Sequence, residues 1–397
     1  MKRLSVVLLA LSVAAPAFAQ KRGLRPDDVY NLREVRDPQR SPDGRWVAFV
    51  VSRAIKETDK NDSDVWMASW DGTQELQLTS TPDDESAPRW SPDNKYLAFL
   101  SSRQGAKAKQ VWLLNRAGGE AIKLTDVKGG VSDYAWSPDS TRLVLVVNEK
   151  DPRDPPEDDE KTTGDKKKTP PPIVVDRYHF KQDIEGYLRG ARTHLYLFDI
   201  AAKKAELLTP GVFDDELPVW SPDGTQIAFV SKRGTGDLDR TENTDVFVID
   251  ARTGAQPRQL TTSPAPDGGR VAWSPDGKQI AYVTGEELKY SAYNQSRLAV
   301  IPAAGGQPRI LAQALDRPMR NPIWTRGAWT QASSGTPESH ELDVIVVDDR
   351  SQYVGRVDLL SDKIQRVTTT PPVITSISRG GMDDDLAVLA ASDNEAP

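Results

Sequence analysis

The sequence contains no cysteine. Disulfides, thiol nucleophiles and cysteine-ligated metals are therefore excluded, and a large hydrophobic core must stabilise the fold without cross-links. Histidine is scarce: His179, His194 and His340 lie far apart, and none has a metal-binding spacing such as H-E-x-x-H. No Gly-x-Ser-x-Gly sequence occurs, so the nucleophile turn of an α/β-hydrolase is missing from these 397 residues. The sequence thus marks no catalytic residue, although it leaves open a triad assembled across distant segments.

Long apolar runs are also missing, since none reaches the roughly 20 residues that a membrane-spanning helix needs. The run Leu4–Ala15 is shorter, follows Lys2 and Arg3, and precedes the A-x-A sequence that ends at Ala19. This order is typical of a secretory signal peptide. We therefore predict a signal peptide over residues 1–19, cleaved after Ala19, and a secreted or periplasmic protein with no membrane span.

The charge balance is acidic, with 58 Asp and Glu against 51 Lys and Arg. Binding to nucleic acid requires a basic surface, so we expect no nucleic-acid partner. The hydrophobic fraction of 38% is that of a globular chain, and 27 Gly with 29 Pro require many turns. This composition favours strands over long helices.

What the sequence does contain is a repeat. Trp-Ser-Pro-Asp-Gly or a close variant recurs about every 50 residues, a period typical of propeller blades. The copies begin at Ser41, Ser91, Ser137, Ser221 and Ser274, with a degenerate sixth at Trp324-Thr325. Tryptophan directly precedes four of the first five copies, namely Trp90, Trp136, Trp220 and Trp273. We predict that these rings pack between blades; an aromatic ligand cage is the alternative.

Each unit predicts four antiparallel strands, which is one blade. A strand ends at Trp-Ser, and Pro, Asp and Gly then form a hairpin turn. An alternating strand such as Ile227–Val230 comes next, then a third such as Val246–Ile249, and a short fourth ends in Leu-Thr, as at Leu260-Thr261. The fold class is therefore an all-β propeller over residues 20–397, with six complete blades.

A partial seventh blade follows the sixth. We predict two strands near Val373–Ser378 and Leu386–Ala391, after which the sequence stops at Pro397. An open half-blade edge would promote aggregation, so we expect the sequence to be cut off, or another segment to complete the blade. Residues 20–39 could supply a closing strand, although Pro26–Leu32 reads better as a short capped helix.

The third unit carries an insertion over residues 148–192. Its first part, Asn148–Pro172, is rich in Pro, Asp, Glu and Lys and is expected to be a mobile surface loop. Ordered character returns at Ile173. For Ile173–Arg189 we weigh a surface excursion against a lid or docking arm over the ring.

Acidic groups offer the remaining candidate sites. Asp83-Asp84-Glu85 and Asp214-Asp215-Glu216 precede tryptophans and could bind Ca²⁺, but such residues more often cap turns and accept backbone N–H bonds at blade junctions. The pair Glu286-Glu287 is given no role. Gly118-Gly119, Gly129-Gly130 and Gly305-Gly306 indicate hairpin turns rather than phosphate loops. We assign no catalytic, metal or cofactor-binding residue and no cofactor.

Two longer stretches resemble a known family. The repeat is similar to that of TolB-type proteins and of the prolyl oligopeptidase family of serine peptidases. Leu32–Gly44 resembles the beginning of the peptidase propellers. Val175–Leu188 with Thr193–Leu197 resembles the third blade of the acylaminoacyl-peptidase and dipeptidyl-peptidase-like branch.

The resemblance implies the non-catalytic, size-filtering half of an exported serine peptidase that acts on short peptides. In that family the catalytic residues lie in a C-terminal α/β-hydrolase domain, which we expect to be this chain's missing partner. The chain alone should then be inactive. The alternative is a stand-alone TolB-like periplasmic propeller that binds a protein.

Overall fold

The computed structural model describes residues 23, 25–149, 174–175, 177–183, 186–188, 190–234, 237–285, 295–326, 339–370 and 373–391. The predicted signal peptide, nearly all of Asn148–Pro172, the Glu286-Glu287 pair and the last six residues lie outside the described residues. Within the described part, no helix is long and apolar enough to cross a membrane.

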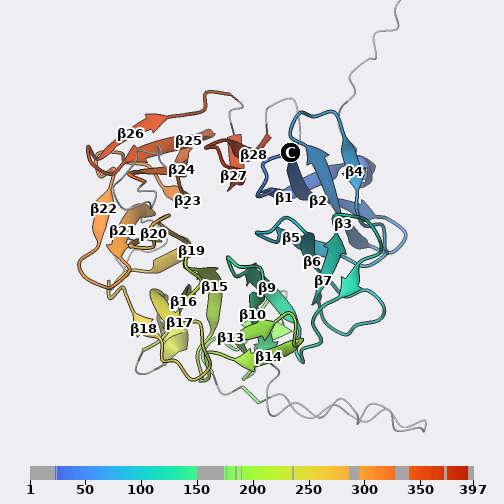
Figure 1. The fold of residues 1–397 in the computed structure, drawn as a ribbon, viewed down its shortest axis with the longest axis horizontal. Coiled ribbons are helices and arrows are strands. Elements are labelled where there is room, and N and C mark those ends of the chain that lie inside the picture. Colours follow the sequence, from blue (N-terminus) through green and yellow to red (C-terminus); the bar gives the residue numbers. More distant parts are fainter. Residues whose placement is uncertain are drawn as a thin grey trace, which may run out of the picture.

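Six blades of four antiparallel strands follow one another around a ring, which confirms the predicted propeller (Figure 1). Five of these blades are separate sheets, and the sixth is continuous with β27 and β28. Blades 1 and 2 consist of β1 (Arg33–Arg40), β2 (Trp46–Ile55), β3 (Lys60–Ser69), β4 (Glu75–Gln77), β5 (Glu85–Trp90), β6 (Tyr96–Ser101), β7 (Gln110–Asn115) and β8 (Ile122–Lys123). Blades 3 and 4 consist of β9 (Val131–Trp136), β10 (Arg142–Glu149), β13 (Arg192–Asp199), β14 (Lys204–Leu207), β15 (Asp215–Trp220), β16 (Gln226–Ser231), β17 (Asp245–Asp250) and β18 (Arg258–Gln259). Blades 5 and 6 consist of β19 (Asp267–Trp273), β20 (Gln279–Thr284), β21 (Arg297–Pro302), β22 (Arg309–Leu311), β23 (Met319–Trp324), β24 (Glu341–Asp348), β25 (Ser351–Asp358) and β26 (Lys363–Arg366).

The Ser-Pro-Asp-Gly repeat forms the same hydrogen-bonded turn in its five copies that begin with serine. In blade 4, Ser221 Oγ donates to Asp223 Oδ1 at 2.6 Å and accepts from the Gln226 amide at 2.9 Å. Gly224 takes a φ of 69°, a left-handed conformation that costs glycine little. The turn therefore fixes the register of the first two strands of its blade.

The tryptophans join neighbouring blades, as predicted. The Trp220 indole N–H donates to the Ala135 carbonyl of blade 3 at 3.1 Å, and its ring packs into the core between the two blades. The same bond recurs from Trp90 to Gln39, Trp136 to Arg89, Trp273 to Val219 and Trp324 to Ala272. Each apolar core lies between two blades rather than within one, which explains why a single blade would be unstable.

The Leu-Thr end of each blade also has a structural role. Thr261 Oγ1 accepts from the Val246 amide of the third strand at 3.0 Å and donates to Asp245 Oδ1 at 3.0 Å. Equivalent backbone bonds are accepted by Thr79, Thr125, Thr209 and Thr368. These hydroxyls satisfy strand-three amides that the short fourth strand leaves unpaired.

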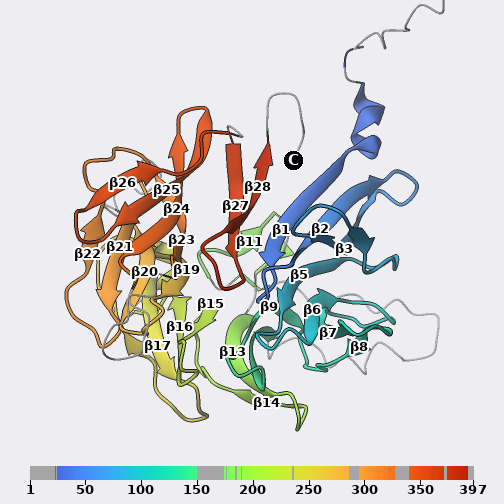
Figure 2. The same ribbon diagram turned by 45° about the horizontal axis from the view of Figure 1, so that its top comes forward.

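The partial seventh blade is the hairpin of β27 (Val373–Arg379) and β28 (Leu386–Ala391). It lies between blade 6 and blade 1, where both of its strands contact β1 (Figure 2). A single parallel bridge from Gln352 of β25 to Val373 of β27 joins the hairpin to blade 6, and in the described residues no strand ladder joins it to blade 1. Residues 33–40 thus begin blade 1 instead of closing the seventh, and Pro26–Asn31 forms the short helix η1, with Pro26 in its first turn.

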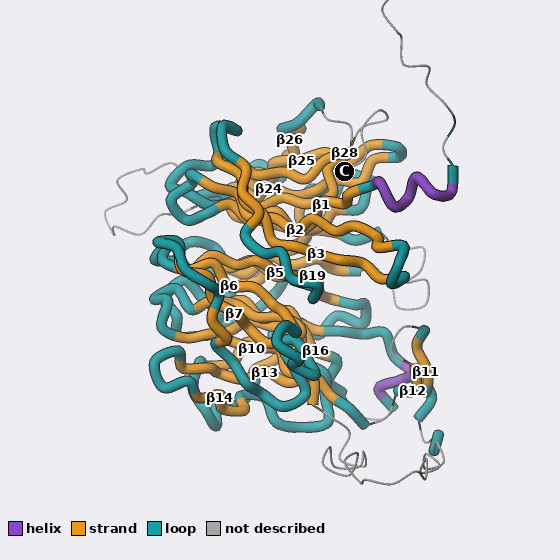
Figure 3. The backbone as a smooth tube through the Cα atoms, turned by 90° about the vertical axis from the view of Figure 1, so that its right-hand side faces the viewer, coloured by secondary structure: helices purple, strands orange, loops and turns teal. Residues whose placement is uncertain are grey.

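The insertion leaves blade 3 between β10 and β13. These strands remain paired through Glu149 and Arg192, so the blade's strand pairing extends slightly into the insertion 148–192 predicted from the sequence. The described part contains the small hairpin of β11 (Lys181–Gln182) and β12 (Gly186–Tyr187). Figure 3 shows this hairpin on the same side of the ring as η1.

Candidate functional site

A cavity of about 420 Å³ lies between the insertion and blade 4. Its walls combine apolar, acidic and basic side chains from Arg177, His179, Leu188, Arg192, Val212, Phe213, Asp214, Glu216, Val230, Ser231, Lys232, Leu238, Asp239 and Thr244. We call this space the insertion cavity. For Ile173–Arg189 the sequence left open a surface excursion or a lid or docking arm. The described part of this stretch covers a hollow on the propeller, as a lid or docking arm would.

Two ion pairs hold the insertion against blade 4. The Arg177 guanidinium binds both carboxylate oxygens of Asp239, and the His179 amide donates to the same carboxylate at 3.1 Å. The bond from Arg177 is the main reason that the pKa of Asp239 falls to about 2. At the other end, Arg192 Nη1 lies 2.9 Å from Asp214 Oδ2. The cations of these two pairs are neutralised, so they do not make the cavity an anion site.

Glu216 is the acidic group of the insertion cavity that has no hydrogen bond or ion pair among the described residues. Glu216 is an exposed residue of β15, and the protein atoms around its carboxyl, with Asp214 and Asp133 nearby, raise the pKa of that carboxyl. A carboxylate of this kind attracts a positively charged group, because such a partner relieves the repulsion from the neighbouring carboxylates. Leu188 and Phe213 add apolar surface beside it.

The acidic triplets identified in the sequence divide into separate roles. Asp215 is fully buried, and Arg233 Nη2 donates to it at 2.7 Å. Glu85 is buried in the same position of blade 2, 2.7 Å from Arg103. In the described residues both carboxylates thus pair with an arginine side chain of their own blade, whereas the expected backbone N–H donor is seen at Asp214, which accepts from the Thr193 amide at 2.9 Å. The sequence could not show that Glu216, next to Asp215, lines a cavity. The alternation of a strand predicts which face of the sheet a side chain lies on, but not which segment packs against that face.

The histidines are dispersed. His194 is buried in β13, with Nδ1 3.7 Å from Asp215 Oδ2 and Nε2 3.9 Å from Glu149 Oε2. His179 lies in the insertion, and His340 precedes β24. Across the described ranges, no serine hydroxyl hydrogen bonds to a histidine ring, and no group of three or more His, Cys, Asp or Glu has an arrangement suited to a metal ion.

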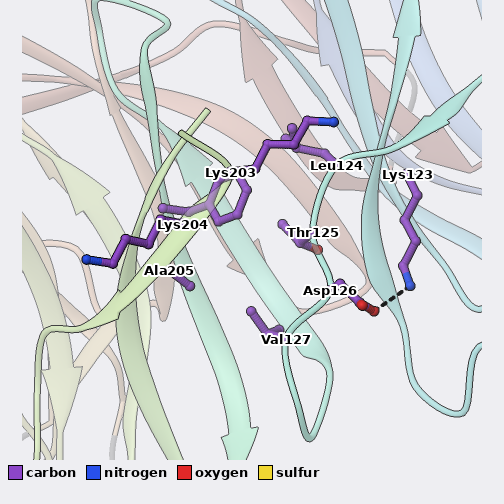
Figure 4. Close-up of a pocket in the computed structure, with 9 residues that line it drawn as sticks. Lys123, Leu124, Thr125, Asp126, Val127, Lys203, Lys204 and Ala205 are labelled. Atoms are coloured by element: carbon purple, nitrogen blue, oxygen red, sulfur yellow. Dashed lines mark hydrogen bonds and ion pairs between the residues drawn. The ribbon is translucent and has the colours of Figure 1, made fainter. Parts of the chain in front are cut away.

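A second cavity, of about 500 Å³, lies between blades 2 and 3 (Figure 4). Its cations are largely neutralised, because Lys123 Nζ binds Asp126 at 2.6 Å and Lys204 Nζ binds Glu206 at 2.6 Å. Surface lysines paired in this way offer little for selective binding. The insertion cavity is therefore the stronger candidate for a functional site.

No family model matches the chain. A Bacillus subtilis protein described as the uncharacterized peptidase YuxL is 30% identical over 230 residues, which cover 58% of this chain and 34% of that protein. Dipeptidyl-peptidase 5 of Porphyromonas endodontalis is 22% identical over 319 residues, 74% of this chain and 45% of that enzyme. This chain thus spans less than half of either relative.

Solved structures with the same fold include peptidases. The acylaminoacyl peptidase of Pyrococcus horikoshii superposes on 91% of this chain with a TM-score of 0.65 and 16% identity; the match covers 49% of that enzyme. The propeller domain of the trilobed protease of Pyrococcus furiosus, described as having an open velcro topology, matches with a TM-score of 0.58 at 14% identity, over 91% of this chain and 90% of that domain. The fold is thus a propeller of the kind that peptidases carry. The predicted resemblance to peptidase propellers is confirmed.

Proposed function

We propose that this chain is the substrate-gating, non-catalytic propeller of an exported serine peptidase that acts on short peptides. Hydrolysis is assigned to an α/β-hydrolase domain outside these 397 residues. The observation that carries the proposal is the 30% identity to a peptidase over more than half of the chain. The likeness in fold over 91% of the chain to an acylaminoacyl peptidase supports it.

The gating mechanism is steric and electrostatic. The ring and the insertion exclude folded proteins from a nucleophile placed against the propeller, which also keeps that site free of bulk water. Glu216 and the apolar wall of the insertion cavity then contact extended peptides that enter. Export is supported by Lys2, Arg3 and the A-x-A sequence ending at Ala19.

Two experiments test this function. The coding sequence beyond Pro397 is read for an in-frame Gly-x-Ser-x-Gly, which we expect. The gene product containing it is then assayed on aminoacyl, acyl-aminoacyl and dipeptidyl substrates and on peptides of increasing length. We expect activity that is sensitive to a serine-directed reagent, falls with peptide length and is absent on folded proteins.

Variants connect this activity to the propeller. We expect Glu216→Gln to raise KM for peptides by about tenfold, equal to about 1.4 kcal/mol, through loss of one charged contact. The matched variant Glu75→Gln, on the exposed outer strand β4, is expected to leave KM unchanged. Robust hydrolysis by the 397-residue chain alone, or equal rates on short peptides and folded proteins, would contradict the proposal.

A further inference from the structure

Most polar groups that line the insertion cavity already have partners within the protein. The two ion pairs described above neutralise four of its charged side chains. Two hydroxyls donate to backbone carbonyls: Ser231 to Asp214 at 2.9 Å, and Thr244 to Asp267 at 3.0 Å. These groups therefore keep their charges and their hydrogen-bond donors inside the protein.

Two charged side chains of the insertion cavity have no ion pair among the described residues, Glu216 and Lys232. Glu216 is exposed on β15. The Lys232 ammonium donates to the Thr241 carbonyl at 2.7 Å, and this neutral acceptor leaves its charge uncompensated. The cavity thus presents one negative and one positive group to a molecule that enters it.

The strand register relates these two charges in space. Glu216 of β15 pairs with Val230 of β16, and Lys232 stands two residues beyond Val230. Alternation puts Lys232 on the same face as Val230 and diagonal to Glu216, and diagonal neighbours on adjacent strands are about 7–8 Å apart. An extended peptide of two or three residues spans about 7–10 Å. The two positions are therefore about as far apart as the ends of such a peptide.

The remaining wall of the cavity is apolar. Leu188 belongs to the insertion, Val212 and Phe213 precede β15, and Leu238 begins the short helix η3 (Leu238–Arg240). Val212 has 65% of its surface exposed, so a side chain bound against it would remove apolar area from water. The volume of about 420 Å³ lies near the lower end of the range for small-ligand pockets. The cavity therefore suits a short peptide with apolar side chains rather than a long chain.

We propose that the insertion cavity binds peptides of two or three residues by both of their free ends. The peptide ammonium lies at Glu216 and the peptide carboxylate at Lys232, so the ligand supplies the two counter-charges that the protein leaves open. Blocking either end removes one charge-assisted contact. This inference deepens the proposed function and rests on it for the source of such peptides, but the binding itself requires no hydrolysis.

The test is a calorimetric titration of the 397-residue chain with the dipeptide Leu-Phe, at pH 7.5 and low salt. The N-acetyl derivative and the C-terminal amide of the same dipeptide are titrated in the same way. We expect the Kd of each derivative to be about tenfold higher than that of the free dipeptide, which corresponds to about 1.4 kcal/mol for one charged contact.

Each cavity variant is expected to lose one discrimination and keep the other. In Glu216→Gln the free and the N-acetylated dipeptide should bind equally, while amidation still weakens binding. In Lys232→Met amidation should have no effect, while acetylation still weakens binding. The discrimination that each variant keeps shows that it is folded. The matched variants Glu75→Gln and Lys363→Met, on the exposed outer strands β4 and β26, are expected to keep both.

Two results would overturn the proposal: no binding of the dipeptide by the chain, or equal binding of the free, acetylated and amidated forms. If both discriminations survive in both cavity variants, the peptide binds elsewhere and the proposal is also wrong. Any of these failures leaves the proposed function standing, because that function is tested by hydrolysis in the longer gene product. Absence of hydrolysis there would leave the binding result unchanged.

Discussion

The junctions of this propeller are of two kinds. Five are built on a tryptophan whose N–H donates to the preceding blade, as Trp220 does to Ala135. The two junctions that flank the half-blade have arginine at the tryptophan position instead. Arg40 and Arg379 pair with Val47 and Leu386 in the same register in which Trp220 pairs with Ile227.

The arginine junctions are ionic. Arg40 is buried and donates to the Gly380 carbonyl at 3.0 Å, the Asp385 carbonyl at 3.1 Å and Asp383 Oδ2 at 3.0 Å. Arg379 pairs with Asp343 of blade 6 and with Asp384. A two-stranded blade offers less apolar surface than a complete one, and a small core of Ile345, Val354, Ile374 and Ile377 joins it to blade 6, so charged hydrogen bonds supplement packing there. The ring is thus held by packing in most places and by buried ion pairs in addition to a small core at its closure.

The largest effect is expected from breaking the ionic closure. Arg40→Met removes the charged bonds to Gly380 and Asp385, and we expect it to lower the free energy of unfolding by about 3 kcal/mol. The measurement is urea unfolding followed by tryptophan fluorescence. The control is Arg45→Met, since Arg45 is exposed and pairs only with Asp43. A loss below about 1 kcal/mol, the range of an exposed pair, would show that the half-blade is held by other contacts.

A tryptophan junction should lose less. Trp220→Phe keeps most of the ring but removes the N–H that donates to Ala135, which leaves a part-buried carbonyl without that donor. We expect a loss of about 1–2 kcal/mol that does not change with salt concentration. Unfolding in 0.1 M and 1 M NaCl gives the comparison. A loss that depends on salt as strongly as that of Arg40→Met would remove the distinction between the two kinds of junction.

A smaller effect concerns pH at the junction of blades 1 and 2. Burial, with Asp62 and Glu85 nearby, raises the pKa of Asp64 to about 6, above its value of about 3.9 in the unfolded chain. The folded state therefore holds the proton more tightly, and this stabilisation is complete below about pH 4. It is lost as the pH rises from about 4 to about 6.

The matched variant for this pH effect is Asp64→Asn, which cannot ionise and can still accept the hydrogen bond from Thr79. Subtracting its unfolding free energies from those of wild type isolates the carboxyl. We expect the unfolding free energy of wild type to fall relative to that of Asp64→Asn as the pH rises from 4 to 6. A difference that stays constant with pH would mean that Asp64 titrates normally in the folded state.

The repeat allowed most of the fold to be predicted, because each blade is a local pattern of alternation and turn residues. The tryptophans could be assigned to blade junctions since rings at one repeated position must meet the neighbouring sheet. The role of Arg40 was not predictable, because its partners at Gly380 and Asp383 are distant in sequence.

The candidate site was less accessible to sequence reasoning. The triplet ending at Glu216 was identified, but its division into three environments depends on how the insertion folds back through Arg177 and Asp239.

Amide hydrogen exchange in 0.1 M and 1 M NaCl tests most directly whether ion pairs hold the closure and packing holds the other junctions. We expect β27 and β28 to exchange at a lower opening free energy than β15 and β16, and to lose further protection at high salt while the tryptophan-joined strands do not change. Equal protection and equal insensitivity to salt in all four strands would contradict the account.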